Sequence, residues 1–140
     1  YTILQEAKNS LKLIYQSIQL LTNNYNINKK DVSLIGFSQG CILSWALLVN
    51  YPEIIRRAVT LSGYIIPDLI DLPLDKIFNL TVFNSHGISD QMIPVSKARD
   101  SFNLIKKNNP NILYKEYDQG HGINQENLND LLEWVKVTSL

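Results

Sequence analysis

The chain has 140 residues, of which 45% are hydrophobic and 19% are charged, so it has enough apolar material for the core of one domain. Its 13 basic and 13 acidic side chains cancel and no segment concentrates Lys or Arg, which argues against a nucleic-acid backbone or an anionic membrane surface as a partner. No apolar run is long enough for stable membrane insertion, and the single cysteine, Cys41, excludes an internal disulfide. We expect one cytoplasmic domain.

The first quarter of the chain has a helical pattern. Apolar residues recur at helical intervals from Ile3 to Leu21, which predicts an amphipathic helix that ends near residue 24. Residues 32–37 are apolar and follow a polar breaker, and they form the first predicted strand. The long apolar run at residues 41–49 predicts a helix that is buried on most sides and stops near Pro52.

Strands and helices alternate along the rest of the sequence. Further strands are predicted over residues 58–61, 80–85 and 112–117, and further helices over residues 95–107 and 127–137. Such alternation favours right-handed crossovers and a parallel sheet with helices on both faces. The predicted fold class is therefore α/β.

The pattern G-x-S-x-G at residues 36–40 lies between the first predicted strand and the helix that follows it. We expect Gly36 and Gly40 to remove Cβ atoms that would collide in a tight turn, so that Ser38 stands exposed at its tip. The helix also directs N–H groups and the positive end of its dipole toward this position. The strand, turn and helix together predict a nucleophilic serine.

An acid and a base follow two later strands. Asp90 comes after the third predicted strand, and His121 comes after the fourth, between two glycines. Alone, the aspartate would be read as a turn former and the histidine as a surface loop residue. The order Ser38, Asp90, His121 is however that of α/β-hydrolases, and parallel strands bring such groups to one edge of a sheet. The sequence predicts a catalytic triad.

Two other chemistries compete for these residues. His86, Asp90 and His121 supply two imidazoles and a carboxylate for a metal ion, but the chain has only two histidines and no cysteine near them. We expect no metal and no cofactor. Cys41 is a second candidate nucleophile, but it falls in the apolar run of a helix, where a buried and inert thiol is the ordinary case.

The segment of residues 64–74 is apolar and contains two prolines, so it cannot form one regular helix. One interpretation is a loop packed on the core. The other is an acyl-chain pocket beside Ser38, lined by Ile65, Leu69 and Leu72.

The sequence resembles the phospholipase/carboxylesterase family of α/β-hydrolases, which includes the acyl-protein thioesterases. The resemblance rests on four segments, residues 36–40, 61–64, 86–94 and 120–122. It implies hydrolysis of esters or thioesters in a small-molecule or acylated substrate, with Ser38 as nucleophile, Asp90 as acid and His121 as general base. It also implies that the backbone N–H of Gln39 is one donor of the oxyanion hole.

The family's chains open with several further strands and a Gly-containing loop that supplies a second oxyanion donor, and this sequence begins after them. We therefore expect an N-terminally truncated α/β-hydrolase domain over residues 1–140, with weakened activity and an uncovered sheet edge that favours homo-oligomers. The alternatives are a peptidase or dienelactone-type hydrolase, and a catalytically impaired piece with a structural or interaction role.

Overall fold

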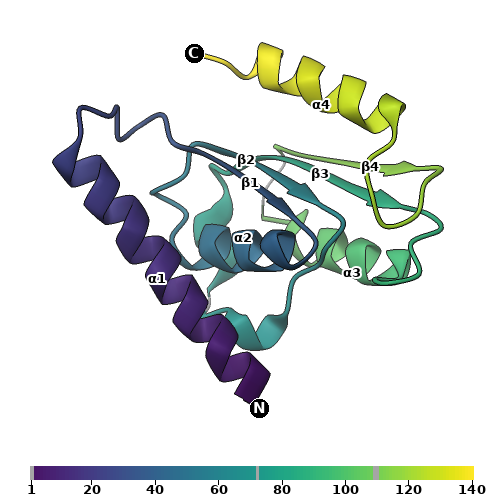
Figure 1. The fold of residues 1–140 in the computed structure, drawn as a ribbon, viewed down its shortest axis with the longest axis horizontal. Coiled ribbons are helices and arrows are strands. Elements are labelled where there is room, and N and C mark those ends of the chain that lie inside the picture. Colours follow the sequence, from purple (N-terminus) through teal and green to yellow (C-terminus); the bar gives the residue numbers. More distant parts are fainter. Residues whose placement is uncertain (1, 72, 109–110) are drawn as a thin grey trace.

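The computed structural model describes residues 2–71, 73–108 and 111–140, and Figure 1 shows its ribbon. In chain order the elements are α1 (Thr2–Asn24), β1 (Ser33–Phe37), α2 (Gln39–Asn50), β2 (Arg57–Leu61), the short 3-10 helices η1 (Pro67–Leu69) and η2 (Leu74–Ile77), β3 (Thr81–Gly87), α3 (Val95–Ile105), β4 (Ile112–Tyr117) and α4 (Gln125–Val137).

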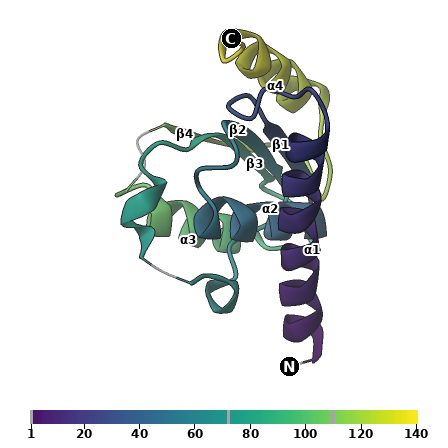
Figure 2. The same cartoon turned by 90° about the vertical axis from the view of Figure 1, so that its left-hand side faces the viewer.

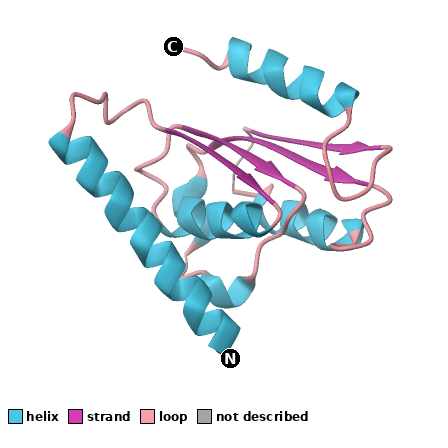
Figure 3. Ribbon diagram, in the orientation of Figure 1, coloured by secondary structure: helices cyan, strands magenta, loops and turns pink. Residues whose placement is uncertain are grey.

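The strands form one parallel sheet in the order β1-β2-β3-β4. The register pairs Phe37 with Leu61 and Leu61 with Ser85, so the carboxyl ends of the first three strands are level with one another. All four arrows point the same way in Figure 3. The loops that follow β1, β3 and β4 therefore meet at one edge of the sheet, which is where the predicted site residues lie.

Helices cover the two faces of the sheet, with α2 and α3 on one side and α4 on the other (Figures 1 and 2). The strands show the alternation that this requires, because Ala58 belongs to the core cluster that includes α2 and its neighbour Val59 to the cluster beneath α4. The helix α1 packs against α2 through Leu11 and its neighbours. None of the helices in the described ranges is long and apolar enough to cross a lipid bilayer.

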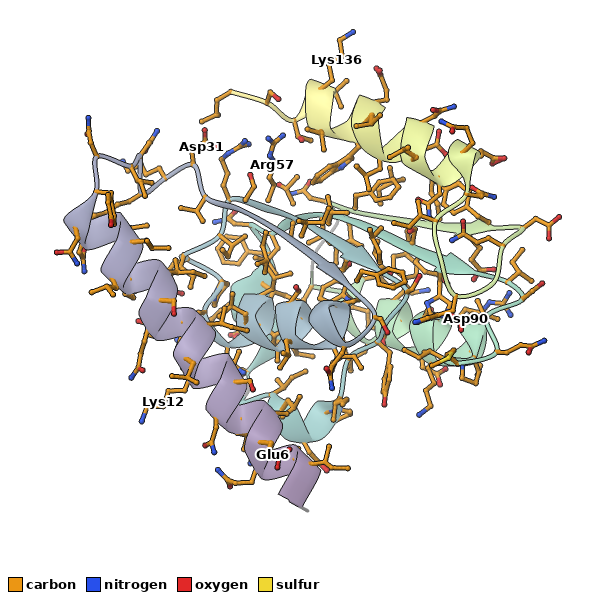
Figure 4. The ribbon with its side chains drawn as sticks, in the orientation of Figure 1. Glu6, Lys12, Asp31, Arg57, Asp90 and Lys136 are labelled. Atoms are coloured by element: carbon orange, nitrogen blue, oxygen red, sulfur yellow. The ribbon has the colours of Figure 1, made fainter. Side chains whose placement is uncertain are left out.

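Two arginines attach the C-terminal end of α4 to the sheet. The guanidinium of Arg57 donates to the carbonyl of Val135 at 2.7 Å and to the hydroxyl of Thr138 at 2.9 Å. Arg56 donates to the carbonyl of Thr138 at 2.7 Å. Figure 4 shows Arg57 reaching from the start of β2 toward this helix. Because α4 follows the loop that carries His121, these bonds also fix where that loop ends.

The predicted elements are confirmed with small differences at their ends. The predicted helix 95–107 ends at Ile105, and the predicted helix 127–137 begins earlier, at Gln125. The second difference arises because the side chain of Asn124 accepts the N–H of Asn127 at 2.8 Å and so caps a helix that begins two residues earlier than predicted. The proline-containing segment 64–74 includes η1 and the start of η2.

The strand β1 is at one edge of the sheet. Its side chains Ile35 and Phe37 remain 65% and 42% exposed, although both are apolar. This face of β1 lies beyond the cover of α4, which packs on Val59, Leu61 and Phe83. This edge of the sheet therefore exposes two large apolar side chains.

Candidate active site

Ser38 occupies a strained turn between β1 and α2. Its φ of 57° and ψ of −117° lie in a region that residues with a side chain rarely adopt. The turn is held on both sides, since Ser38 N–H donates to the carbonyl of Leu61 at 2.9 Å and Ile42 N–H donates to the carbonyl of Ser38 at 3.2 Å. The hydroxyl is thereby presented at the carboxyl edge of the sheet.

The two glycines of the motif do different things. A Cβ on Gly36 would collide with the carbonyl oxygen of Gly40 and the hydroxyl of Ser44, so this position needs glycine. A Cβ on Gly40 would meet nothing within 4 Å, so the prediction that Gly40 also avoids a collision is wrong. The close approach is made by the backbone of Gly40 onto Gly36, and the α-carbon of Gly40 itself faces open space.

The structure brings Ser38, His121 and Asp90 into one hydrogen-bonded row. The Nε2 atom of His121 lies 2.8 Å from the Oγ of Ser38, and its Nδ1 lies 2.8 Å from Oδ2 of Asp90. Since a carboxylate only accepts, Nδ1 carries the proton and Nε2 is free to accept the serine proton. Figure 4 places Asp90 at the carboxyl ends of the strands. This arrangement can move a proton from hydroxyl to imidazole.

Asp90 has a fully buried carboxylate that accepts three hydrogen bonds. Its Oδ1 accepts the N–H groups of Met92 and Ile93, each at 2.9 Å, while Oδ2 accepts from His121. Burial acts to raise the pKa of Asp90, but the hydrogen bonds from Ile93, His121 and Met92 together outweigh it and leave the pKa below its ordinary value of 3.8. The group is therefore ionised at neutral pH.

The loop of His121 is braced by a glutamine that the sequence analysis did not single out. Gln119 Nε2 donates to the carbonyl of Gly122 at 2.7 Å, and its Oε1 accepts the N–H of Asn124 at 2.6 Å. These bonds close the loop around the histidine. No local pattern marks this role, because both partners are backbone groups positioned by the loop itself.

The His121 loop also packs closely on the end of β3. A Cβ on Gly87 would collide with the carbonyl oxygens of Gln119 and Gly120. The ring of Phe37 lies on another side of the histidine, with ring centroids 5.1 Å apart. The imidazole is therefore confined by β1, β3 and its own loop, and its side chain keeps 18% of its surface exposed.

His86 is the second histidine of the chain and is fully buried. Its Nε2 lies 2.7 Å from the carbonyl oxygen of Ile93 and 3.4 Å from Oδ2 of Asp90. The sequence suggested His86 only as a possible metal ligand. Within residues 2–71, 73–108 and 111–140, no group of three or more His, Cys, Asp and Glu side chains is placed to hold a metal ion.

Gln39 and Cys41 lie in the first turn of α2. The N–H groups of a helix's first turn have no acceptor within the helix and lie at the positive end of its dipole, so the Gln39 N–H is suited to a developing negative charge beside Ser38. The Cys41 thiol is fully buried, and burial raises its pKa far above the ordinary value. This thiol is therefore neutral and shielded.

The residues predicted to line an acyl pocket do not share one cavity. Ile65 lines a cavity of about 240 Å³ between the start of the 64–74 segment and α3. Leu69 lines another, of about 360 Å³, beside Tyr15 and Tyr51. Ser38, Asp90 and His121 are not among the residues that line either one. Leu72 lies outside the described residues. An acyl-binding role for these side chains stays a prediction.

Comparison with known proteins gives a consistent family signal. The sequence profile of the phospholipase/carboxylesterase family matches residues 2–139. Acyl-protein thioesterase 1 of Kluyveromyces lactis is 29% identical over 134 residues, covering 91% of this chain and 58% of that protein. A probable inactive carboxylesterase of Oryza sativa is 25% identical over 119 residues, covering 78% of this chain and 46% of that protein. The chain thus spans about half the length of these relatives.

A comparison with solved structures supports the fold class. The carboxylesterase of Bacillus cereus superposes on the chain with a TM-score of 0.84 at 17% sequence identity, covering 95% of this chain and 62% of that chain. At this identity the likeness establishes an α/β-hydrolase-type sheet with helices on both faces.

Proposed function

Because the chain belongs to the phospholipase/carboxylesterase family, we propose that it is a serine hydrolase that cleaves carboxylic esters or thioesters through an acyl-enzyme on Ser38. The observation that carries this proposal is the hydrogen-bonded row in which His121 lies 2.8 Å from both Ser38 and Asp90. Three side chains from separate loops meet there in the order that nucleophilic catalysis requires.

The proposed reaction begins when the Oγ of Ser38 attacks the carbonyl carbon of the substrate and its proton passes to Nε2 of His121. The carbonyl oxygen takes the negative charge and is stabilised by the N–H of Gln39 and the dipole of α2. When the tetrahedral intermediate collapses, His121 returns the proton to the departing alcohol or thiol. Water then repeats these steps on the acyl-serine and releases the acid.

Asp90 would hold the imidazole in the tautomer that this reaction needs. Its carboxylate accepts the Nδ1 proton of His121 and stabilises the positive charge that forms on the ring. The depressed pKa of Asp90 supports this role, because the carboxyl group stays ionised through the neutral range. The exposed part of the His121 ring leaves one side of the site open to a substrate.

The test is labelling by a fluorophosphonate probe, which reacts with activated serines. Ser38→Ala should abolish labelling and ester hydrolysis. Ser44→Ala is the matched control, because Ser44 lies six residues further along the chain, within α2, and donates to the carbonyl of Gly40. Persistent labelling of Ser38→Ala, or equal loss in both variants, would refute the assignment.

The acyl group and the leaving group are not fixed by the triad, because the same three residues serve several acyl-transfer reactions. We propose esters or thioesters of small-molecule or acylated substrates on the strength of the family, with peptidase or dienelactone-type activity as the alternative. Rates over matched esters, thioesters and amides separate these cases. A Leu69→Ala variant with an altered preference for long over short p-nitrophenyl esters would support the acyl-pocket prediction.

A second candidate function is a catalytically impaired piece that serves as a structural or interaction module. One observation favours it: a relative in Oryza sativa is named a probable inactive carboxylesterase. Stoichiometric labelling of Ser38 without measurable ester turnover would favour this second function, and turnover with labelling would exclude it.

A further inference from the structure

His86 is a buried, titratable side chain to which the proposed reaction assigns no step. It lies near the end of β3, with Glu116 as its register partner on β4. No part of its side chain reaches solvent. Burying a polar ring costs free energy of folding unless its nitrogen atoms have hydrogen-bond partners.

The contacts of the ring fix which nitrogen carries the proton. Nε2 lies 2.7 Å from the carbonyl oxygen of Ile93, and a carbonyl oxygen can only accept. Nε2 therefore carries a proton and donates it to Ile93. The same atom lies 3.4 Å from Oδ2 of Asp90, close enough for a favourable electrostatic contact with the carboxylate.

Ile93 is the link between His86 and the catalytic acid. Its N–H donates to Oδ1 of Asp90 at 2.9 Å, while its carbonyl accepts from His86. Both the N–H and the carbonyl of Ile93 therefore hold the turn from Asp90 to Ile93 in place. With Oδ1 occupied by this turn, Oδ2 is left directed at His121.

The state of the other ring nitrogen, Nδ1, agrees with a role of His86 through Nε2. Nδ1 of His86 is buried and has no hydrogen-bond partner among the described residues. The carboxylate of Glu116, the register partner of His86 on β4, accepts from the guanidinium of Arg99 and the hydroxyl of Tyr114. An apolar side chain would fill the space without leaving a nitrogen unpaired, so the Nε2 contacts are the feature that distinguishes histidine here.

We propose that His86 is a positioning residue that holds the Asp90 carboxylate through the carbonyl of Ile93 and so fixes the orientation of His121. The inference rests on the proposed function, because it assigns His86 to the support of that same triad. His86 does not touch the substrate or the reacting atoms.

The first test uses the unsubstituted chain. In ¹⁵N-labelled protein, the ring of His86 should show a proton on Nε2 that is protected from exchange, with Nδ1 unprotonated. A ring protonated only on Nδ1 would overturn the proposal, whatever the activity of the chain. This measurement requires no variant to fold.

The second test compares two substitutions whose side-chain amide N–H groups lie at different distances from the backbone. His86→Gln carries its amide nitrogen at about the position of Nε2 and should label with fluorophosphonate at close to the unsubstituted rate. His86→Asn carries it at about the position of Nδ1 and should label about tenfold to a hundredfold more slowly, the scale on which a small misplacement of catalytic groups lowers rates. His86→Phe, which has no donor, should behave like His86→Asn.

A readout at His121 separates positioning from mere folding. The Nδ1 proton of His121 should give a downfield NMR signal in the unsubstituted chain and in His86→Gln, and that signal should be lost in His86→Asn. Equal labelling and equal signals in all variants would overturn the proposal, as would equal losses in His86→Gln and His86→Asn. If the unsubstituted chain does not label, the proposed function fails, while the two NMR measurements still decide the role of His86.

Discussion

The two sides of the candidate site are built in different ways. Asp90 and His121 lie between β3, β4 and α4, where buried hydrogen bonds fix both the acid and the loop that carries the base. Ser38 follows β1, the edge strand, whose Ile35 and Phe37 remain exposed. Hydrogen bonds within this chain therefore hold Asp90 and the His121 loop in place, whereas Ser38 lies on a strained turn with support from β2 and α2.

The difference has a physical lesson for how the site is held. An ionised group that is buried requires several donors around it, and the turn after β3 supplies them from its own backbone. A serine hydroxyl requires only exposure and direction, which a positive φ at Ser38 provides. At neutral pH, substitutions that remove the Asp90 carboxylate should therefore act mainly on the reactivity of Ser38, whereas substitutions of the glycines around Ser38 should act mainly on the stability of its turn.

The largest effect is expected at the buried acid. Asp90→Asn should keep the fold but lower the rate of fluorophosphonate labelling by about 10⁴-fold, because the amide favours the wrong tautomer of His121. Asp100→Asn is the control, since Asp100 is an exposed residue of α3. Equal labelling rates for the two variants would show that Asp90 does not serve the nucleophile.

Substitutions of the glycines around Ser38 should change the stability of the fold. Gly36→Ala should lower the free energy of unfolding by about 1–3 kcal/mol, because its Cβ collides with Gly40 and Ser44. Gly40→Ala should leave stability unchanged or raise it by about 0.5–1 kcal/mol, since its Cβ meets open space at the start of α2. Urea unfolding measures both. Equal destabilisation by the two substitutions would contradict the assigned packing.

Acidification should weaken the acid side of the site. The pKa of Asp90 is lower in the folded chain than its ordinary value of 3.8, so its stabilising contribution is present above 3.8 and is lost as the pH falls toward the folded pKa. One such carboxyl contributes a slope of up to about 1.4 kcal/mol per pH unit. The stability of Asp90→Asn, measured by thermal unfolding, should fall less steeply than that of the unsubstituted protein as the pH drops below 3.8. Parallel curves for the two proteins would contradict this.

The smallest effect on stability is expected at the exposed edge. Ile35→Thr should change the free energy of unfolding by no more than about 0.5 kcal/mol, because the side chain is largely exposed. We expect the edge to favour homo-oligomers, so the same substitution should reduce self-association in sedimentation experiments. Ile3→Thr, at an exposed position of α1, is the control. Unchanged association of Ile35→Thr would remove β1 as the contact.

Much of the fold and the row of site residues could be predicted from the sequence. The period of the apolar residues indicated the strands and helices, and the positions of Ser38, Asp90 and His121 after the first, third and fourth strands indicated one edge of the sheet. These features are local or follow from parallel topology, so no knowledge of side-chain packing was needed.

The roles of the supporting residues could not be predicted from the sequence, and one physical reason explains this for all of them. His86 contacts a backbone carbonyl in the turn after β3, and Gln119 contacts backbone groups of its own loop, and the direction of those groups is known only once the turns are built. The error at Gly40 has the same origin, because whether a Cβ collides depends on the local backbone path. Ile65 and Leu69 are four residues apart on an apolar segment, yet they line separate cavities once the chain turns through η1.

The most direct measurement is the mass-spectrometric mapping of the fluorophosphonate adduct on the unsubstituted chain. The adduct is predicted on the hydroxyl of Ser38 alone, with labelling that is lost when the protein is unfolded beforehand. An adduct on another residue, or an unmodified Ser38 in the folded protein, would contradict the claim that His121 and Asp90 activate this serine.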